Sequence, residues 1–198
     1  MRIVLLLVLV VVTIGVIVGA TPSFRGQAAG EPSSEPGALT LVGDSLNVGI
    51  EPYLREALPG SRIEAFDVVG RGTSDGIEEL RRLSGTLAPV LVVSLGTNDA
   101  EGTESRFRGL VEEALELAGE DTCVVWATIV RDGTARTGFN EVLFAAQGRH
   151  ANLRLVDWAA LVEDDPTMLA PDLVHGTPVG YARRAGETAR VARACSRA

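Results

Sequence analysis

An apolar run that ends in glycine, aspartate and serine limits the fold more than any other feature of the sequence. Residues 39–42 read Leu-Thr-Leu-Val, then come Gly43, Asp44 and Ser45, and a helix-like pattern begins at Leu46. This order places a serine at the carboxyl end of a buried strand, where open α/β sheets bind their ligands. Backbone N–H groups at a helix N-terminus can stabilise an oxyanion. Ser45 is therefore a candidate nucleophile that needs a base.

The base must come from one of two histidines, His150 and His175. After His175, Thr177 and Pro178 predict the N-cap and first position of the last helix. Asp172, three residues before His175, can fold back onto the imidazole, fix its tautomer and stabilise the imidazolium. His150 ends a predicted helix and has no acid nearby in sequence, which is typical of a solvated residue that favours the helix dipole. We therefore predict His175 as the base.

Two further loops follow predicted strands. Gly70 comes after the strand 62–69, and residues 96–99 (Gly-Thr-Asn-Asp) come after the strand 90–94. The carboxyl ends of parallel strands meet at one edge of a sheet, so these loops should lie beside the serine. A glycine permits close approach of the backbone, and the side chain of Asn98 carries an amide donor.

These four segments resemble the motif blocks of the SGNH (GDSL) hydrolases. The blocks are Gly-Asp-Ser-Leu at 43–46, the lone Gly70, Gly-Thr-Asn-Asp at 96–99 and Asp-x-x-His at 172–175, in that order. Each motif is weak alone, but four in the right order and context are specific. The resemblance covers residues 38–198.

The resemblance implies a role for each matching residue. Ser45 would be the nucleophile, His175 the base and Asp172 the residue that orients it. The N–H groups of Ser45 and Gly70 and the side chain of Asn98 would form the oxyanion hole. No metal and no cofactor is implied.

The rest of the sequence alternates between strand and helix patterns, which predicts an α/β fold. We expect a three-layer α/β/α sandwich around a five-stranded parallel sheet in the flavodoxin-like order 2-1-3-4-5. Pro52 is expected to break the first helix and restart it. The predicted strands are 39–42, 62–69, 90–94, 122–127 and 153–156, and the predicted helices are 46–58, 76–83, 104–118, 137–149 and 178–196.

The first 37 residues predict export. Residues 3–20 are uncharged and mostly aliphatic, which suits either a signal peptide or an N-terminal membrane anchor. Residues 18–20 (Val-Gly-Ala) form a small-residue cleavage site in the first case. Residues 21–37 are rich in Pro, Gly, Ser and Ala, and predict a flexible linker. We expect an extracytoplasmic domain, either secreted or held at the outer face of the cytoplasmic membrane through residues 3–20.

The charged residues exclude several function classes. The net charge of −8 argues against nucleic acid and against a basic membrane-surface binder. The sequence contains no lysine, which excludes Schiff-base chemistry and a phosphate-loop lysine. We expect a monomer whose partner is a small-molecule or carbohydrate ester.

Residues 72–76 (Gly-Thr-Ser-Asp-Gly) match the G-x-S-x-G nucleophile elbow and, with Gly70, a loose dinucleotide-binding pattern. Arg71 lengthens the turn beyond the sharp one that the elbow requires, and too few strands precede it. No acid ends the strand 90–94 to hold a ribose. We interpret Ser74 and Asp75 as a cap of the next helix.

Other polar and aromatic residues receive structural interpretations. Asp44 and Asp99 flank the predicted catalytic positions Ser45 and Asn98, and acids in tight turns usually bond local backbone N–H groups. The acidic run 163–165 is expected to be a solvated loop. Trp126 and Arg131 come at or after the end of the fourth strand, near the predicted active edge. Both are candidates for substrate contact, and the alternative for Trp126 is a place in the core.

Three functions remain open. The first is an exported esterase that acts on short O-acyl esters through a serine acyl-enzyme. The second is acyl transfer, because residues 69–71 and 155–158 resemble loops of the extracytoplasmic SGNH domain of cell-envelope O-acetyltransferases. The third is a binding module of the cell envelope without catalysis, which the intact set of motif residues disfavours.

Cys123 and Cys195 are the two cysteines of the chain. Cys123 opens the fourth strand and so lies at the amino edge of the sheet. The last helix starts beside His175 at the other edge and runs antiparallel to the strands, so its far end returns Cys195 to the amino edge. Export would let a disulfide persist between them. The alternative is two inert buried thiols.

Overall fold

The computed structural model describes residues 35–195 of the chain. The predicted signal peptide or anchor (1–20) and almost all of the predicted linker (21–37) lie outside the described residues. Between residues 35 and 195, no helix is both long enough and apolar enough to cross a membrane.

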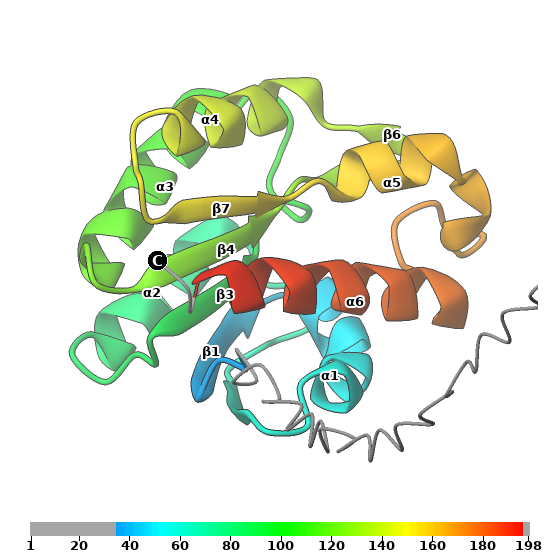
Figure 1. Cartoon of the computed structure of the whole chain (residues 1–198). Helices are drawn as coiled ribbons and strands as arrows, with labels where there is room; N and C mark the ends of the chain where they lie inside the picture. The colour runs from blue at the N-terminus through cyan, green and yellow to red at the C-terminus, as the bar shows by residue number, and fades with distance from the viewer. Residues whose placement is uncertain (1–34, 196–198) are drawn as a thin grey trace, which may run out of the picture. The chain divides into compact units, whose positions relative to one another are not determined.

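The core of the domain is one five-stranded sheet (Figure 1). Its order is β2-β1-β3-β4-β7, and every neighbouring pair is parallel. β7 is the fifth strand of this sheet along the chain, so the predicted flavodoxin-like order is confirmed. The strands are β1 (Ala38–Gly43), β2 (Arg62–Ala65), β3 (Val90–Ser94), β4 (Cys123–Ala127) and β7 (Leu153–Val156).

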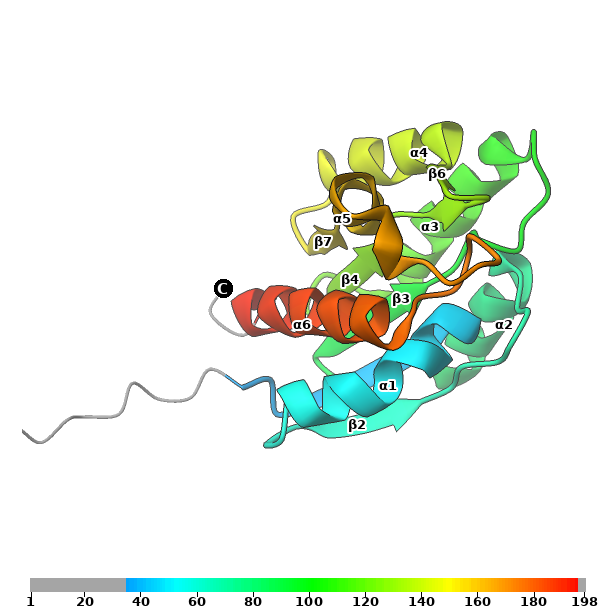
Figure 2. The ribbon, with the colours of Figure 1, turned by 90° about the vertical axis from the view of Figure 1, so that its right-hand side faces the viewer.

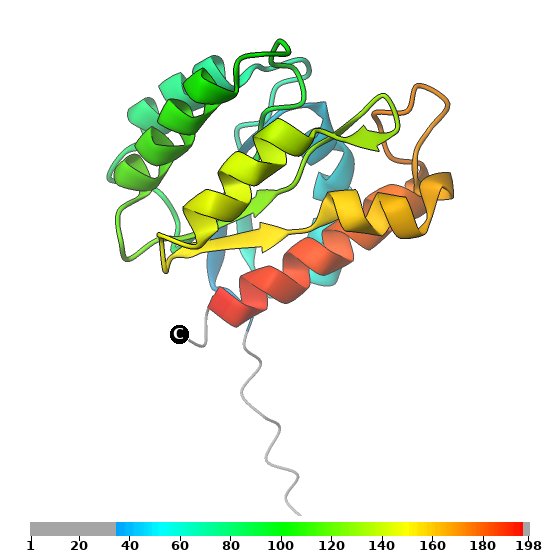
Figure 3. The same cartoon turned by 90° about the horizontal axis from the view of Figure 1, so that it is seen from above.

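Helices cover both faces of the sheet (Figure 3). α1 and α6 pack against each other on one face, with α5 beside them (Figure 2), and α2, α3 and α4 cover the other. Strand residues alternate between the two cores: Val90 and Val92 face α1 and α6, whereas Leu91 and Val93 face the other layer. The helices are α1 (Ser45–Ala57), α2 (Thr73–Leu83), α3 (Glu104–Ala118), α4 (Thr137–Gln147), α5 (Trp158–Asp164) and α6 (Pro178–Cys195).

Several local predictions are wrong. Pro52 does not break the first helix, which runs unbroken through it. Proline removes only the N–H that would bond to Val48, and this residue is exposed, so water can satisfy its carbonyl. β2 ends at Ala65 instead of 69, and α2 begins at Thr73, three residues early. The short hairpin of β5 (Val130–Arg131) and β6 (Thr134–Ala135), the 3-10 turn η1 (Pro166–Met168) and α5 have no counterpart among the predicted elements.

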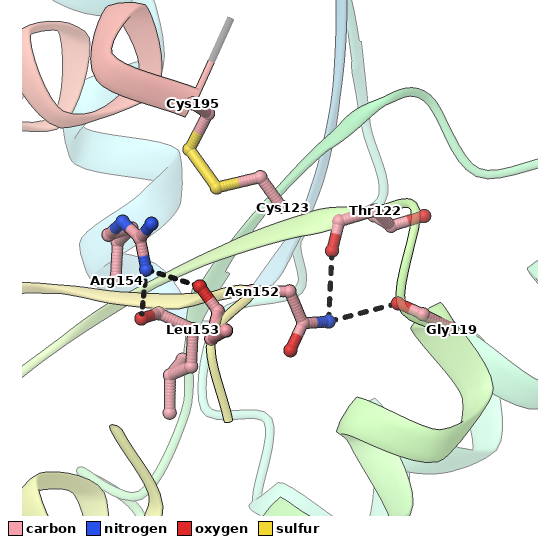
Figure 4. Close-up of a disulfide and its surroundings, with 8 residues drawn as sticks. Gly119, Thr122, Cys123, Asn152, Leu153, Arg154 and Cys195 are labelled. Atoms are coloured by element: carbon pink, nitrogen blue, oxygen red, sulfur yellow. Dashed lines mark hydrogen bonds between the residues drawn. A yellow bond between two sulfur atoms is a disulfide. The ribbon is translucent and has the colours of Figure 1, made fainter. Parts of the chain in front are cut away.

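The two cysteines are joined in a disulfide at the amino edge of the sheet (Figure 4). Cys123 begins β4 and Cys195 ends α6, with their Cα atoms 5.8 Å apart. The bond therefore fixes the far end of the helix whose first turn follows His175. Asn152 strengthens the same edge, since its amide donates to the carbonyls of Gly119 and Thr122 (Figure 4).

Candidate active site

Ser45 is the first residue of α1, directly after β1 and the N-cap Asp44. One carboxylate oxygen of Asp44 accepts a hydrogen bond from the N–H of Leu46 at 3.0 Å. Asp44 also donates its own backbone N–H to the carbonyl of Ser94 at the end of β3. These bonds fix the start of the helix against the carboxyl edge of the sheet, so Ser45 has a defined position there.

His175 lies in a tight turn before α6. Both oxygens of Asp172 serve this turn: Oδ1 accepts from the N–H groups of Val174 and His175, each at 3.0 Å, while Oδ2 faces the imidazole. Leu173, between them, has a φ of +60°, a left-handed conformation that is strained for leucine. The carbonyl of His175 accepts from the N–H of Ala170 at 2.8 Å, which closes the turn.

A chain of hydrogen bonds links the three predicted catalytic residues. Nε2 of His175 lies 2.9 Å from Oγ of Ser45, and Nδ1 lies 2.7 Å from Oδ2 of Asp172. Hydrogen bonds from the backbone and the ring of His175 lower the pKa of Asp172 to about 2. Asp172 is thus an anion at neutral pH that favours Nδ1–H, which leaves Nε2 free to accept the serine proton.

Asn98 connects the Gly-Asp-Ser-Leu segment to the segment that contains Gly70. Its side-chain Nδ2 donates to Oδ2 of Asp44 at 3.3 Å and to the carbonyl of Arg71 at 3.1 Å. Asp44 precedes Ser45, and Arg71 follows Gly70. The Asn98 amide therefore joins the residue before Ser45 to the residue after Gly70. The three segments that carry the predicted oxyanion donors meet at this point.

The N–H groups of Ser45 and Gly70 donate to no atom of residues 35–195. Gly70 has a φ of +77°, a backbone conformation that a residue with a side chain would adopt only with strain. These two donors are available to a ligand. Both hydrogens of the Asn98 amide, by contrast, are engaged, so a ligand oxygen would have to replace the Arg71 carbonyl or share its hydrogen.

The site is open to solvent. The side chain of His175 is 41% exposed and that of Asp172 is 53% exposed. Two exposed valines, Val68 and Val69, line a hollow of about 450 Å³ beside Gly70. A bulky alcohol group can therefore reach the serine without passing through a closed pocket.

Buried polar side chains form hydrogen bonds with Asp44, the residue that precedes Ser45. Ser94, at the end of β3, donates its hydroxyl to Oδ1 of Asp44 at 3.2 Å and accepts from Nη2 of Arg184 at 2.9 Å. All three side chains are almost fully buried. Burial raises the pKa of Asp44, and the positive charge of Arg184 opposes that rise. Burial lowers the pKa of Arg184 to about 10, so Arg184 remains a cation at neutral pH.

A second buried pair links α1 to the segment that precedes Gly70. Nδ2 of Asn47 donates to Oδ1 of Asp67 at 3.1 Å. Oδ1 of Asn47 and Oδ2 of Asp67 are buried and have no hydrogen-bond partner within residues 35–195. Burial raises the pKa of Asp67 to about 7. A proton on Oδ2 of Asp67 would turn this oxygen into a donor, which could then bond to Oδ1 of Asn47.

The remaining sequence candidates are not part of this constellation. Ser74 accepts a hydrogen bond from Arg106 at 2.7 Å, and His150 bonds to Glu112 at 2.8 Å. Trp126 is fully buried and donates to the carbonyl of Leu95, so it belongs to the core. Arg131 donates to the carbonyl of Thr97 and thereby braces the Gly-Thr-Asn-Asp loop.

The acids of tight turns behave differently from one another. Asp44 bonds a local N–H, as expected, and adds the two contacts to Ser94 and Asn98. Asp99 instead caps α2, since its Oδ1 accepts from the N–H of Thr73 at 2.8 Å. Asp165, the last acid of the run 163–165, caps η1. No group of acids, histidines or cysteines within residues 35–195 is arranged to hold a metal ion.

Sequence reasoning missed Ser94, Arg184, Asn47 and Asp67. Arg184 carried a detectable signal, because it occupies a core position of α6 among buried small residues. A charged residue on the apolar stripe of a helix needs a buried partner. The sequence alone does not indicate that this partner is Asp44.

No family model matches the sequence. The chain is 28% identical over 162 residues to the peptidoglycan O-acetyltransferase OatA of Listeria monocytogenes, a match that covers 80% of this chain and 24% of that protein. The chain thus spans about a quarter of the length of its curated relative.

Solved structures extend the comparison. A lipase/acylhydrolase from Enterococcus faecalis superimposes with a TM-score of 0.66 at 21% identity, over 79% of this chain and 95% of that one. A member of the lipolytic G-D-S-L family from Veillonella parvula gives 0.65 at 20% identity, over 78% and 96%. The chain has the fold of the SGNH (GDSL) hydrolases. The C-terminal catalytic domain of Streptococcus pneumoniae OatA, with a methylsulfonyl adduct, shares this fold with a TM-score of 0.61 at 19% identity, over 78% and 88%.

Proposed function

We propose that this protein is an exported serine enzyme that cleaves O-acyl esters through an acyl-enzyme. The observation that carries the proposal is the hydrogen-bonded series Ser45–His175–Asp172, with heavy-atom distances of 2.9 and 2.7 Å. This geometry suits nucleophilic catalysis, in which a base activates a serine and an acid orients the base.

In the first half of the reaction, Oγ of Ser45 attacks the ester carbonyl and His175 Nε2 takes its proton. The oxyanion that forms would accept from the N–H groups of Ser45 and Gly70 and from the amide of Asn98. The imidazolium then protonates the leaving alcohol, which departs. Asp172 stabilises the imidazolium throughout. In the second half, His175 activates water, which releases the acyl group as an acid.

A short acyl group on a polymer of the cell envelope is the proposed substrate. The similarity to a peptidoglycan O-acetyltransferase supports an envelope polymer as the alcohol. The exposed Asp172 and His175 side chains support the same conclusion, because an open site accepts a large alcohol. The apolar residues 3–20 support an extracytoplasmic location, as a signal peptide or an anchor.

Acyl transfer is the second candidate, favoured by the same similarity to OatA. The two functions share the acyl-enzyme and differ in what removes the acyl group. Hydrolysis needs water alone, whereas transfer needs an acceptor hydroxyl. Hydrolysis is the simpler proposal because water is the only acceptor that it requires.

The test is a panel of p-nitrophenyl esters of increasing chain length, run with and without peptidoglycan-derived oligosaccharides. We expect acetate to be the best substrate, with acid formed at the same rate in both series, and Ser45→Ala to be inactive. A rate that rises and saturates with oligosaccharide, with acylated sugar seen by mass spectrometry, would favour transfer. A wild-type protein as inactive as Ser45→Ala would contradict both functions and support a binding module.

A further inference from the structure

Arg184 is a buried cation whose guanidinium group makes a single hydrogen bond within the described residues. Its Nη2 donates to Ser94, while its Nε and Nη1 are buried without partners in residues 35–195. The guanidinium carbon lies 5.5 Å from the centre of the Trp158 ring, within range of a cation–π interaction. None of the ion pairs within residues 35–195 includes Arg184.

Such a residue is costly for the fold. Removing an ion from water is strongly unfavourable, and replacing buried ions by apolar side chains of similar size is often neutral or stabilising. The neighbours of Arg184 on the buried side of α6 are small or apolar, so a methionine would suit the position. Stability of the helix packing therefore does not account for an arginine here.

The position of Arg184 relative to Asp44 suggests its role. The hydroxyl of Ser94 stands between them, accepting from Arg184 and donating to Asp44 Oδ1. Oδ2, the other oxygen of Asp44, accepts from the amide of Asn98. One continuous series of polar contacts thus joins a buried cation on the last helix to the amide proposed to bind the oxyanion.

We infer that Arg184 is a positioning residue: it keeps Asp44 ionised, and the ionised carboxylate holds the Asn98 amide with one hydrogen aimed at the oxyanion. This inference rests on the proposed function. An ionised carboxylate only accepts hydrogen bonds, so it fixes one amide hydrogen and, with it, the plane of the amide. The second hydrogen, now on the Arg71 carbonyl, is the one that the oxyanion would take.

Protonation of Asp44 would undo this arrangement. A carboxylic acid carries an O–H donor, which would face the N–H donor of Asn98. The amide would then move away or rotate to present its oxygen to the acid. The charged or titratable groups that act on Asp44 are Arg184 and Tyr181 on α6 and Asp67 before Gly70. Arg184 is the one that favours the anion, so its removal should raise the pKa of Asp44.

Four variants of the full chain, purified in detergent, test the inference. Arg184→Met removes the charge and keeps an unbranched apolar side chain, and Arg184→Lys keeps the charge. Ser94→Ala removes the hydroxyl that links Arg184 to Asp44 and leaves both buried charges in place. Arg190→Met is the matched control, because Arg190 lies on the same helix with a side chain that is 67% exposed and bonds only to Glu187 among the described residues. Thermal unfolding establishes which variants are folded.

Two readouts are measured between pH 5 and 10: kcat and KM on p-nitrophenyl acetate, and the ¹³C chemical shift of the Asp44 carboxyl group. We expect Arg184→Met to lower kcat at pH 7 by about tenfold or more with little change in KM, and to regain activity at alkaline pH. The Asp44 midpoint should rise by about one pH unit or more. Arg184→Lys should restore the wild-type profile, Ser94→Ala should raise the Asp44 midpoint to a smaller extent, and Arg190→Met should match the wild type.

Two results would overturn the inference. One is an Arg184→Met variant that loses the same fraction of kcat at every pH while Asp44 titrates as in the wild type. The other, should Arg184→Met not fold, is a Ser94→Ala variant whose Asp44 titration is unchanged. A wild type without esterase activity whose Asp44 midpoint still rises on removal of Arg184 would contradict the proposed function instead, and would leave the coupling of Arg184 to Asp44 established.

Discussion

Gly43, the last residue of β1, leaves the space in which the side chain of Asn47 lies. A Cβ atom on Gly43 would fall 2.6 Å from Nδ2 of Asn47 and 2.9 Å from its Cβ, closer than such atoms come in folded proteins. The glycine of the Gly-Asp-Ser-Leu motif is therefore needed here for space, since its φ is not positive. It allows Asn47 to reach Asp67, and so ties the helix that begins at Ser45 to the segment before Gly70.

Gly43→Ala should consequently destabilise the fold. Asn47 is buried and cannot move aside freely, so we expect the free energy of unfolding to fall by about 1–3 kcal/mol. Urea denaturation measures this loss. Gly109→Ala is the control, because a Cβ there meets nothing within 4 Å and alanine favours a helix; it should be neutral or slightly stabilising. Equal midpoints for the two variants would contradict the steric role of Gly43.

Asn98 and Asp99 are neighbours with different expected roles. Asn98→Ala removes a proposed oxyanion donor, so kcat should fall by about 10²–10³ with little change in KM. Asp99→Ala removes the cap of α2, and should cost about 1 kcal/mol of stability while most activity remains. Steady-state kinetics and urea denaturation of both variants separate the two effects. The reverse pattern would show that the oxyanion assignment is wrong.

The sheet order and the segments of the site could be predicted because each depends on local sequence. Runs such as residues 90–94 are apolar enough to identify as buried strands, and the alternation with helices leaves a parallel sheet as the simplest arrangement. The loops after these strands then meet at one edge without further information. Ser45, Asn98 and His175 are therefore predicted to lie together at the carboxyl edge of the sheet.

The errors occur where tertiary contacts override local patterns. A proline such as Pro52 usually interrupts a helix, but the packing of α1 against α6 and the sheet holds this helix continuous. The strands of the β5–β6 hairpin are too short to show a period of two. The pairing of Arg184 with Ser94 and Asp44 spans up to 140 residues of chain, and nothing in a single sequence specifies such a partner.

Asp67 predicts a pH dependence of stability. Its pKa of about 7 in the folded state is higher than the ordinary 3.8, so between these values the folded protein holds more protons than the unfolded chain. Stability should therefore fall as the pH rises through this window. Asp67→Asn removes the penalty, and should be more stable than the wild type at pH 8 by about 1–3 kcal/mol, with little difference at pH 4.

Urea denaturation of the wild type and Asp67→Asn at both pH values checks this prediction. Asp121→Asn, an exposed acid in the turn before β4, is the control and should leave the pH dependence unchanged. A stability difference between wild type and Asp67→Asn that is the same at pH 4 and pH 8 would mean that Asp67 does not titrate in this window.

The disulfide should contribute to stability without contributing to chemistry. It joins residues 72 positions apart, and a cross-link that closes a loop of this length stabilises the fold by about 4 kcal/mol in the chain-entropy account. The bond lies at the amino edge, whereas the His175 turn is held at the other edge by its own bonds to Asp172 and Ala170. The double variant Cys123→Ser, Cys195→Ser should thus lose stability to urea by about this amount and keep its kcat at 25 °C.

Thiol titration of denatured, unreduced protein from an oxidising compartment should find no free thiol. Two free thiols, or a double variant as stable as the wild type, would show that α6 does not depend on this bond and that packing alone fixes the end of the helix.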